Sequence, residues 1–314
     1  MLFAVLLVVV GAALLTAGAE AFAENVTAAA TGLGVSVLAL AVLLAGAEPE
    51  EAITAMVAAG QGHPALAAGD ALGANLVILT LTVGLAALVV GLPVSRRVLE
   101  YAGAAVLLGA LAVALLWNGV LGRGEGVLLV LVYAAGVAWV WRRERTPPVI
   151  GEMAETELEG VEAVAEDSGR PLLFVLLGLV GMVAGGFLAV LGAERLVDVL
   201  DVKESVIGLT VLALATSAEM IALVWAARRN GVNEVIVAGA IGAVGYNATV
   251  TLGLAGIVNP LVLGLRSQAA EVGVLTAVLP LVLFAGHRSG RLPRWLGVPL
   301  LACYAAVVWW LFAS

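Results

Sequence analysis

The chain has 314 residues, of which 62% are hydrophobic and 12% are charged, and its formal net charge is -8. Its mean hydropathy is +1.12, whereas a soluble domain is only about 45–50% apolar. This composition excludes a soluble enzyme. It indicates a polytopic protein embedded in a lipid bilayer, for which we expect no enzymatic activity and no nucleic-acid partner.

The first apolar run, 2–22, ends among the small residues Ala21 and Ala23, as a signal peptide would. No basic residue precedes the run, and an internal repeat gives it a counterpart later in the chain. We therefore expect a membrane span, with a cleaved signal peptide as the alternative. Further runs of about 18 or more residues follow, each long enough to cross a hydrocarbon core about 30 Å thick. The expected spans are roughly 2–22, 31–59, 65–92, 99–121, 125–141, 171–193, 204–227, 233–258, 267–286 and 295–313.

The chain repeats itself. "DALGANLVILTLTVGL" (70–85) aligns without gaps on "GAIGAVGYNATVTLGL" (239–254), an offset of 169 that also places Glu50 on Glu219. Five spans in each half force the second half to enter the membrane in the opposite direction, an arrangement common in secondary transporters. We expect an all-α polytopic membrane protein of about ten transmembrane helices, built as two inverted five-helix repeats. The expected parts are a first repeat at 1–141, an acidic linker at 142–170 and a second repeat at 171–314.

The basic residues predict the orientation in the membrane. Eleven of the 15 Arg and Lys residues fall on the side of the linker and four on the other side. We expect an integral protein of a prokaryotic-type cell membrane, with the linker in the cytoplasm and both termini outside.

Acidic residues lie inside two apolar runs. Glu48, Glu50 and Glu51 surround Pro49, and Glu219 lies in "GLTVLALATSAEMIALVWAA". A carboxylate at the bilayer centre costs about 2.5–3.5 kcal/mol, so such groups are rare and usually functional. Glu50 and Glu219, matched across the repeat, predict a cation site; for Glu48 and Glu51, protonation or a position at a helix end is an equal alternative.

Pro49 removes a backbone donor and disrupts the helix before it. Irregular backbone at membrane depth is tolerated where it lines a cavity. Freed carbonyl groups and carboxylates together offer oxygen ligands, which suit Ca²⁺, Na⁺ or Mg²⁺. The second half has Thr216 and Ser217 in place of the proline, and their hydroxyls are further candidate ligands.

Two pairs of motifs resemble those of the Ca²⁺/cation antiporter superfamily, to which the sodium/calcium exchangers belong. An element similar to the family's "G-T-S-x-P-E" stands at 46–50 and, as Thr-Ser-Ala-Glu, at 216–219. An element similar to "G-S-N-x-x-N" stands at 73–78 and 242–247. The resemblance spans nearly the whole chain, and it implies that Glu50, Glu219 and Asn247 face the transported cation.

The chain departs from the family pattern at Ala74, Ala243 and Ile78, which stand where serines and an amide or acid are usual. The expected ligand set is therefore thinner than in a typical exchanger. Asp70 is either a further ligand or a solvated residue at a helix start, and Asn75 is either a ligand or a contact between helices. The weaker ligand candidates are Thr216, Thr210, Ser217, Asp70, Glu48 and Asn75.

These residues predict a secondary active antiporter that exchanges Ca²⁺ for Na⁺ by alternating access at a midplane site with two glutamates. Exchange of Ca²⁺ or another cation for H⁺ is the alternative, because the missing serines and amide remove Na⁺ ligands but leave titratable acids. A third possibility is a degenerate, non-transporting homologue. We expect inorganic cations as partners and no cofactor. His63 and His287 fall in connecting loops, where solvated histidines are expected, and Cys303 lies alone in the last apolar run.

Overall fold

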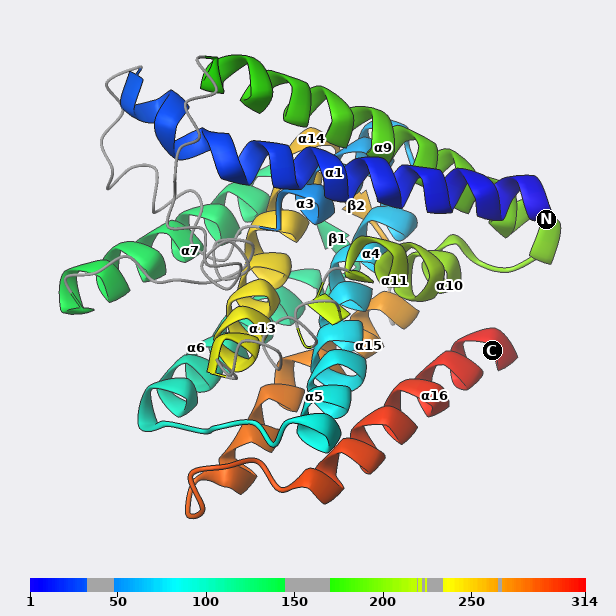
Figure 1. Cartoon of the computed structure of the whole chain (residues 1–314). Helices are drawn as coiled ribbons and strands as arrows, with labels where there is room; N and C mark the ends of the chain where they lie inside the picture. Colours follow the sequence, from blue (N-terminus) through cyan, green and yellow to red (C-terminus); the bar gives the residue numbers. More distant parts are fainter. Residues whose placement is uncertain (33–47, 145–169, 219, 222–223, 225–233, 265–266) are drawn as a thin grey trace.

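The computed structural model describes residues 1–32, 48–144, 170–218, 220, 221, 224, 234–264 and 267–314. Almost all of these residues are helical, and the helices pack into one bundle (Figure 1). The first half contains α1 (Leu2–Gly32), α3 (Pro49–Gly60), α4 (Pro64–Leu76), η1 (Val77–Thr82), α5 (Val83–Val89), α6 (Arg96–Leu116), β1 (Val120–Leu121) and α7 (Arg123–Glu144). The second half contains α9 (Pro171–Leu200), α10 (Glu204–Ile207), η2 (Gly208–Leu212), α11 (Ala213–Thr216), α13 (Glu234–Tyr246), η3 (Asn247–Thr251), α14 (Leu252–Val258), β2 (Leu261–Val262), α15 (Gln268–Val278), η4 (Leu279–Gly286), η5 (Arg294–Leu296) and α16 (Gly297–Ala313).

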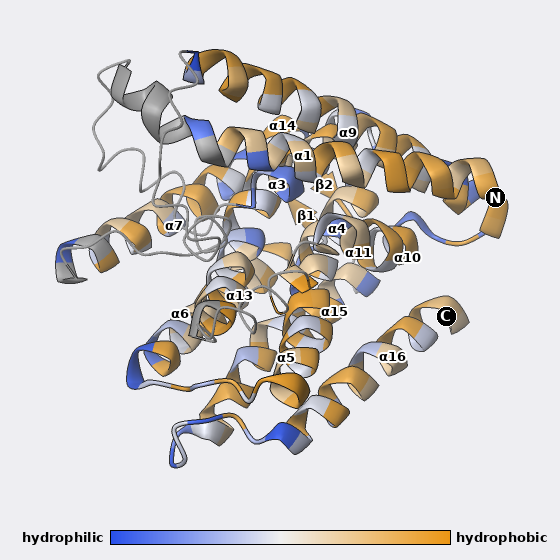
Figure 2. Cartoon of the chain, viewed as in Figure 1, coloured by the Kyte–Doolittle hydropathy of each residue, from blue (hydrophilic) through white to orange (hydrophobic). Residues whose placement is uncertain are grey.

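Eight helical stretches among the described residues are long and apolar enough to cross a membrane. They are Leu2–Phe22, Pro64–Val89, Arg96–Leu116, Arg123–Val140, Pro171–Leu200, Ile236–Val258, Gln268–Gly286 and Arg294–Ala313. The other two expected spans, 31–59 and 204–227, lie partly outside the described residues; their described parts are α3 and the helical stretch Glu204–Thr216. The prediction of an all-α polytopic membrane protein is confirmed. In Figure 2 the long helices are mostly hydrophobic, with hydrophilic residues at their ends and at the start of α3.

The first helix is longer than expected, since α1 continues to Gly32. No glycine or proline interrupts 19–31, so the polar residues there do not end the helix.

The two halves run in opposite directions. Helices α1 and α9 lie side by side (Figure 1), and a Cβ atom on Gly11 would come within 2.5 Å of the Ala189 nitrogen and 2.7 Å of the Gly185 carbonyl oxygen. Gly192, farther along α9, instead approaches the carbonyl of Ala4, near the start of α1. The helices are therefore antiparallel and their backbones touch, a contact that only small residues permit.

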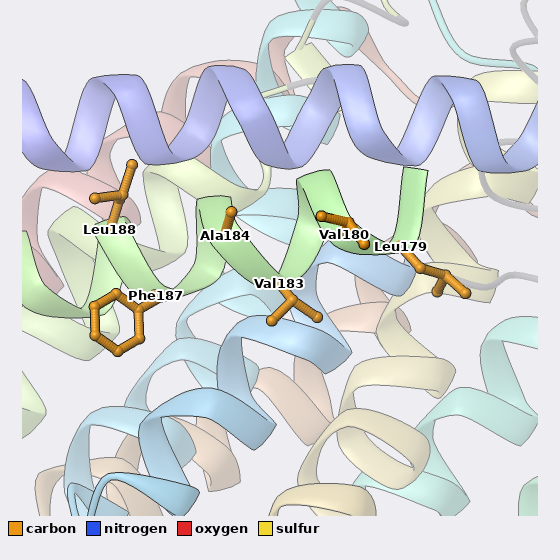
Figure 3. A pocket seen from close by; sticks show the side chains of 6 residues that line it. All are labelled: Leu179, Val180, Val183, Ala184, Phe187 and Leu188. Atoms are coloured by element: carbon orange, nitrogen blue, oxygen red, sulfur yellow. The ribbon is translucent and has the colours of Figure 1, made fainter. Parts of the chain in front are cut away.

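On its outer face α9 carries an open groove of about 600 Å³, lined by Leu179, Val180, Val183, Ala184, Phe187 and Leu188 (Figure 3). Its apolar lining suits lipid chains and offers no ligand to an ion.

Three of the central helices contain a π-helical turn, in which backbone hydrogen bonds span five residues: η1, η2 and η3. Such turns are rare and occur frequently at functional sites. The repeat extends to this detail. Thr80 donates to the Leu76 carbonyl, and the repeat-equivalent residue Thr249 donates to the carbonyl of Gly245, the equivalent of Leu76. Strands β1 and β2 pair antiparallel, so the two halves also join through their backbones.

Candidate functional site

The acidic residues of the first half lie at the beginning of α3. Pro49 occupies the first helical position, where its missing N–H costs nothing and its fixed φ favours the helix. Glu50 and Glu51 follow in the first turn, and Glu48 directly precedes the helix. The exposed fractions of these three glutamates are 1%, 0% and 0%. Because the N-terminal end of a helix is the positive end of its dipole, it stabilises negative charge there.

Pro49 therefore begins a helix that presents three buried carboxylic acids, which explains why a proline and acids occur together in so apolar a run. The residues before Glu48, at 33–47, lie outside the described part of the chain, and so do Gly46 and Ala47 of the motif. Glu219, the predicted partner of Glu50, also lies outside it.

The hydroxyl groups at the end of α11 reach across to acids of the first half. Ser217 Oγ donates to Glu51 Oε1 at 2.6 Å, and Thr216 Oγ1 lies 3.1 Å from Asp70 Oδ1. All four residues are at most 2% exposed. The structure thus brings Thr216, Ser217 and Asp70 together, and it makes Asp70 a buried residue in the middle of α4 rather than a solvated helix start.

Close backbone packing holds these pairs in place. Helix α4 lies against η2 and α11, and a Cβ atom on Gly73 would come within 2.7 Å of Leu209 Cα and of the Ala213 methyl group. The absence of a side chain at Gly73 therefore lets the two helices that carry Asp70 and Thr216 approach each other.

Asn247 begins η3 and is fully buried. Its Oδ1 accepts a hydrogen bond from Thr251 Oγ1 at 2.9 Å, while its Nδ2 has no hydrogen-bond partner among the described residues. An amide oxygen has two lone pairs, so Oδ1 keeps one for a cation. Since η3 packs against α3 and α4, Asn247 lies on elements that adjoin those of Glu50 and Asp70.

Asn75 joins the two repeats. Its Nδ2 donates to the backbone carbonyl of Val244 at 3.1 Å, and these two residues are equivalent in the repeat. The bond therefore lies near the axis that relates the halves, and it supports the helix-contact interpretation of Asn75. Its Oδ1 has no hydrogen-bond partner in the described part of the structure.

Thr210 is buried, but its hydroxyl donates to the Val206 carbonyl of its own helix at 2.6 Å. Among the described residues, the Thr210 hydroxyl makes no hydrogen bond to Glu48, Glu50, Glu51 or Asp70.

Sequence reasoning did not select two features of this region. For Glu51 the sequence leaves a functional role and a position at a helix end equally open and does not place it in the ligand list, although its carboxylate is the one that Ser217 contacts. Tyr246 and Tyr133 stack edge to face with ring centroids 5.6 Å apart and pack with Ala52 of α3. Tyr246 lies inside the second motif, whereas nothing in the sequence around Tyr133 distinguishes this buried residue from the rest of its apolar run.

The site is rich in buried acids. Glu48, Glu50, Glu51 and Asp70 are buried, whereas every Arg and Lys whose side chain the structure describes is exposed. Buried carboxylates need a counter-charge or a proton, because an uncompensated charge in a low-dielectric interior is very costly. The described residues do not include a ready-formed group of three or more His, Cys, Asp or Glu ligands. Cations or protons that enter from solution are able to supply such a balance.

Comparison with known proteins gives the family. A family model described as "Sodium/calcium exchanger protein" matches residues 3–142 and 170–313. The chain is 28% identical to inner membrane protein YrbG of Escherichia coli (strain K12), over 99% of this chain and 98% of that protein. It is 26% identical to the putative antiporter CaxA of Alkalimonas amylolytica, over 94% and 93% of the two chains.

A solved structure of the sodium-calcium exchanger NCX_Mj has the same fold, with a TM-score of 0.63 and 20% identity over 98% of both chains. The two blocks of the family match cover both halves of the chain and omit most of the polar linker. The chain belongs to the sodium/calcium exchanger protein family.

Proposed function

We propose that this protein is a secondary active antiporter that exchanges Ca²⁺ for Na⁺ at the buried acids, and that it is a transporter rather than an enzyme. The observation that carries the proposal is the gathering of buried carboxylic acids of the first half against hydroxyl groups of the second half. Membership of the family and the printed names of the relatives, an antiporter and a sodium-calcium exchanger, support it.

The proposed ligands are Glu50, Glu219 and Asn247. Ca²⁺ takes about 6–8 oxygen ligands, and two bidentate glutamates with one amide supply five at most. Asp70, Glu48 and the hydroxyls of Thr216 and Ser217 lie in the same buried region, and with water they complete the shell. The alanines at 74 and 243 contribute no oxygen, so we assign a larger share of the coordination to carboxylates than the family pattern implies.

Exchange follows from charge balance. One divalent cation or two monovalent ions neutralise two carboxylates equally, whereas the empty charged site is costly to move through a low-dielectric layer. Suppose that the site can switch between facing the outside and facing the cytoplasm only when its charge is neutralised. The outward flux of one ion class is then coupled to the inward flux of the other. Two antiparallel halves with the site between them suit such a change.

Exchange for H⁺ is the second candidate, and a specific observation favours it. Two of the acids, Glu51 and Asp70, lie within hydrogen-bond distance of the hydroxyl groups of Ser217 and Thr216. A carboxyl group that is protonated can make the same contacts, so protons are able to replace Na⁺ as the ions that neutralise the site.

The orientation is part of the proposal. The arginine-rich side, with 142–170, faces the cytoplasm, and both termini lie outside.

Radioactive-calcium uptake into proteoliposomes tests the function, with either a Na⁺ gradient or a pH gradient imposed in the opposite direction. We expect uptake driven by Na⁺ alone; uptake driven by a pH gradient alone would select the second candidate. Glu219→Gln should abolish uptake while the protein remains folded. Absence of uptake by the wild-type protein under both gradients would contradict the proposal.

A further inference from the structure

His63 lies in the turn between α3 and α4, and the prediction that it is a solvated loop residue is wrong. Its backbone N–H donates to the Ala58 carbonyl at 2.9 Å, and α4 begins at the next residue, Pro64. The side chain is 20% exposed and lies between two glutamates. The other histidine, His287, is exposed.

One ring nitrogen of His63 is held by a carboxylate. Nδ1 lies 2.9 Å from Oε1 of Glu204, the first residue of α10. An ionised carboxylate only accepts hydrogen bonds, so Nδ1 carries the proton and donates it. In a neutral imidazole the lone pair then resides on Nε2.

The other ring nitrogen faces a second carboxylate at a greater distance. Nε2 lies 3.9 Å from Oε1 of Glu194, which belongs to α9 and whose side chain is 45% exposed. This separation is too long for a hydrogen bond. A tetrahedral Zn²⁺ with ligands at about 2.0–2.2 Å holds them about 3.3–3.6 Å apart. The half-exposed Glu194 side chain therefore needs to move by only about 0.5 Å for both groups to bind one ion.

We propose that His63 Nε2 and Glu194 bind a divalent transition-metal ion of the Zn²⁺ class, with Glu204 as the partner that orients the imidazole. A histidine that donates its second nitrogen to a carboxylate is the usual arrangement around protein-bound zinc, and it makes the ligating nitrogen more basic. The described residues contain no group of three converging ligands, so water completes the coordination, which the partial exposure of both side chains allows. Imidazole nitrogen distinguishes this site from the all-oxygen transport site and disfavours Ca²⁺.

The nearby basic groups leave Glu194 available. The Arg195 guanidinium lies 4.9 Å from the centre of the Phe3 ring, and Lys203 donates to the backbone oxygen of Ser314. The contact of Arg195 with Phe3 also places the site at the end of the bundle that carries the N-terminus. In the proposed orientation this end faces the outside, where an external ion can reach it.

The site connects the two repeats. His63 leads into α4, which carries Asp70 and Asn75, while Glu194 lies on α9 of the second half. A bound ion therefore ties α4 to α9, and it slows transport if these helices move relative to each other during the cycle.

The test is Zn²⁺ binding to the purified full-length protein in detergent, measured by calorimetry with Ca²⁺ in excess so that the transport site is occupied. We expect one bound Zn²⁺ in the wild type and at least tenfold weaker binding in H63Q and in E194Q. E204Q should weaken binding about 10–100-fold, as the loss of such orienting partners generally does. H287Q is the matched control and should bind as the wild type does.

Absence of Zn²⁺ binding by the wild type, or equal binding by H63Q, would overturn the site. Equal binding accompanied by an altered pH dependence of transport in H63Q would show instead that His63 exchanges a proton with its two glutamates. The binding outcomes do not depend on transport, so they are separate from any failure of the proposed exchange. In proteoliposomes, external Zn²⁺ should slow Ca²⁺ uptake by the wild type and not by H63Q. An unchanged rate with Zn²⁺ bound would refute the restraint on α4 and α9.

Discussion

Replacement of Gly73 by alanine tests whether the close approach of α4 to η2 and α11 builds the site. The new Cβ atom would lie 2.7 Å from Leu209 Cα, from the Leu209 carbonyl oxygen and from the Ala213 methyl group. Ordinary contact begins at 3.4 Å, so the helices must move apart by about 0.7 Å, and such overpacking typically costs about 1–3 kcal/mol. The same movement stretches the 3.1 Å contact between Asp70 and Thr216 beyond hydrogen-bond length.

We therefore expect Gly73→Ala to lower the thermal unfolding temperature in detergent and to raise the KM for Ca²⁺. Gly103→Ala is the matched control, because a Cβ atom at Gly103 in α6 meets nothing within 4 Å. This control should keep the wild-type KM and gain stability, since alanine is favoured over glycine in a helix by about 1 kcal/mol. A Gly73→Ala protein with wild-type melting temperature and KM would refute the reasoning.

Three further predictions concern the acids and the topology. Glu50→Gln should abolish Ca²⁺ uptake while the protein stays folded, as judged by size-exclusion chromatography. The control Glu100→Gln, at an exposed ion pair, should transport normally. Near-normal uptake by Glu50→Gln would show that Glu50 is not part of the site. Ser217→Ala should raise the KM for Ca²⁺ roughly tenfold or more, because a hydrogen bond to a charged group contributes about 1.5–3 kcal/mol. The control Ser205→Ala loses a buried hydrogen bond to Gln268 and should leave the KM unchanged. Equal effects of the two variants on the KM would argue against a role for Ser217 at the site. A single cysteine at Val149, in a Cys303→Ala background, should resist impermeant thiol reagents added outside intact cells; labelling there would reverse the orientation.

The sequence alone was sufficient for the class of fold because hydrophobicity and length determine membrane spans directly. The repeat could also be read directly, since Gly73 and Gly242, or Thr80 and Thr249, recur at one offset. The equivalent hydrogen bonds of Thr80 and Thr249 show that the shared residues make shared backbone structure.

Other features depend on contacts that no local pattern encodes. The π-helical turns lie inside runs that are apolar on nearly every face, so no periodicity in the sequence indicates η1, η2 or η3. Asp70 was ambiguous because its environment comes from Thr216, 146 residues away. His63 was misassigned for the same reason, since Glu204 lies 141 residues from it in sequence.

Pro49 shows what the structure adds to a sequence pattern. The sequence suggested freed carbonyl groups in the turn before the proline, and that turn lies outside the described residues. Among the described residues Pro49 is the first residue of α3, and the helix start gathers three buried glutamates whose charge its dipole favours.

Equilibrium binding of radioactive calcium to the purified protein, measured as Na⁺ and pH are varied, tests most directly whether one buried acid cluster serves both ion classes. A shared site predicts that Na⁺ or H⁺ displaces Ca²⁺ competitively and that Glu50→Gln removes the competed binding. Calcium binding that is unaffected by Na⁺ and pH, or that persists in Glu50→Gln, would contradict exchange at these acids.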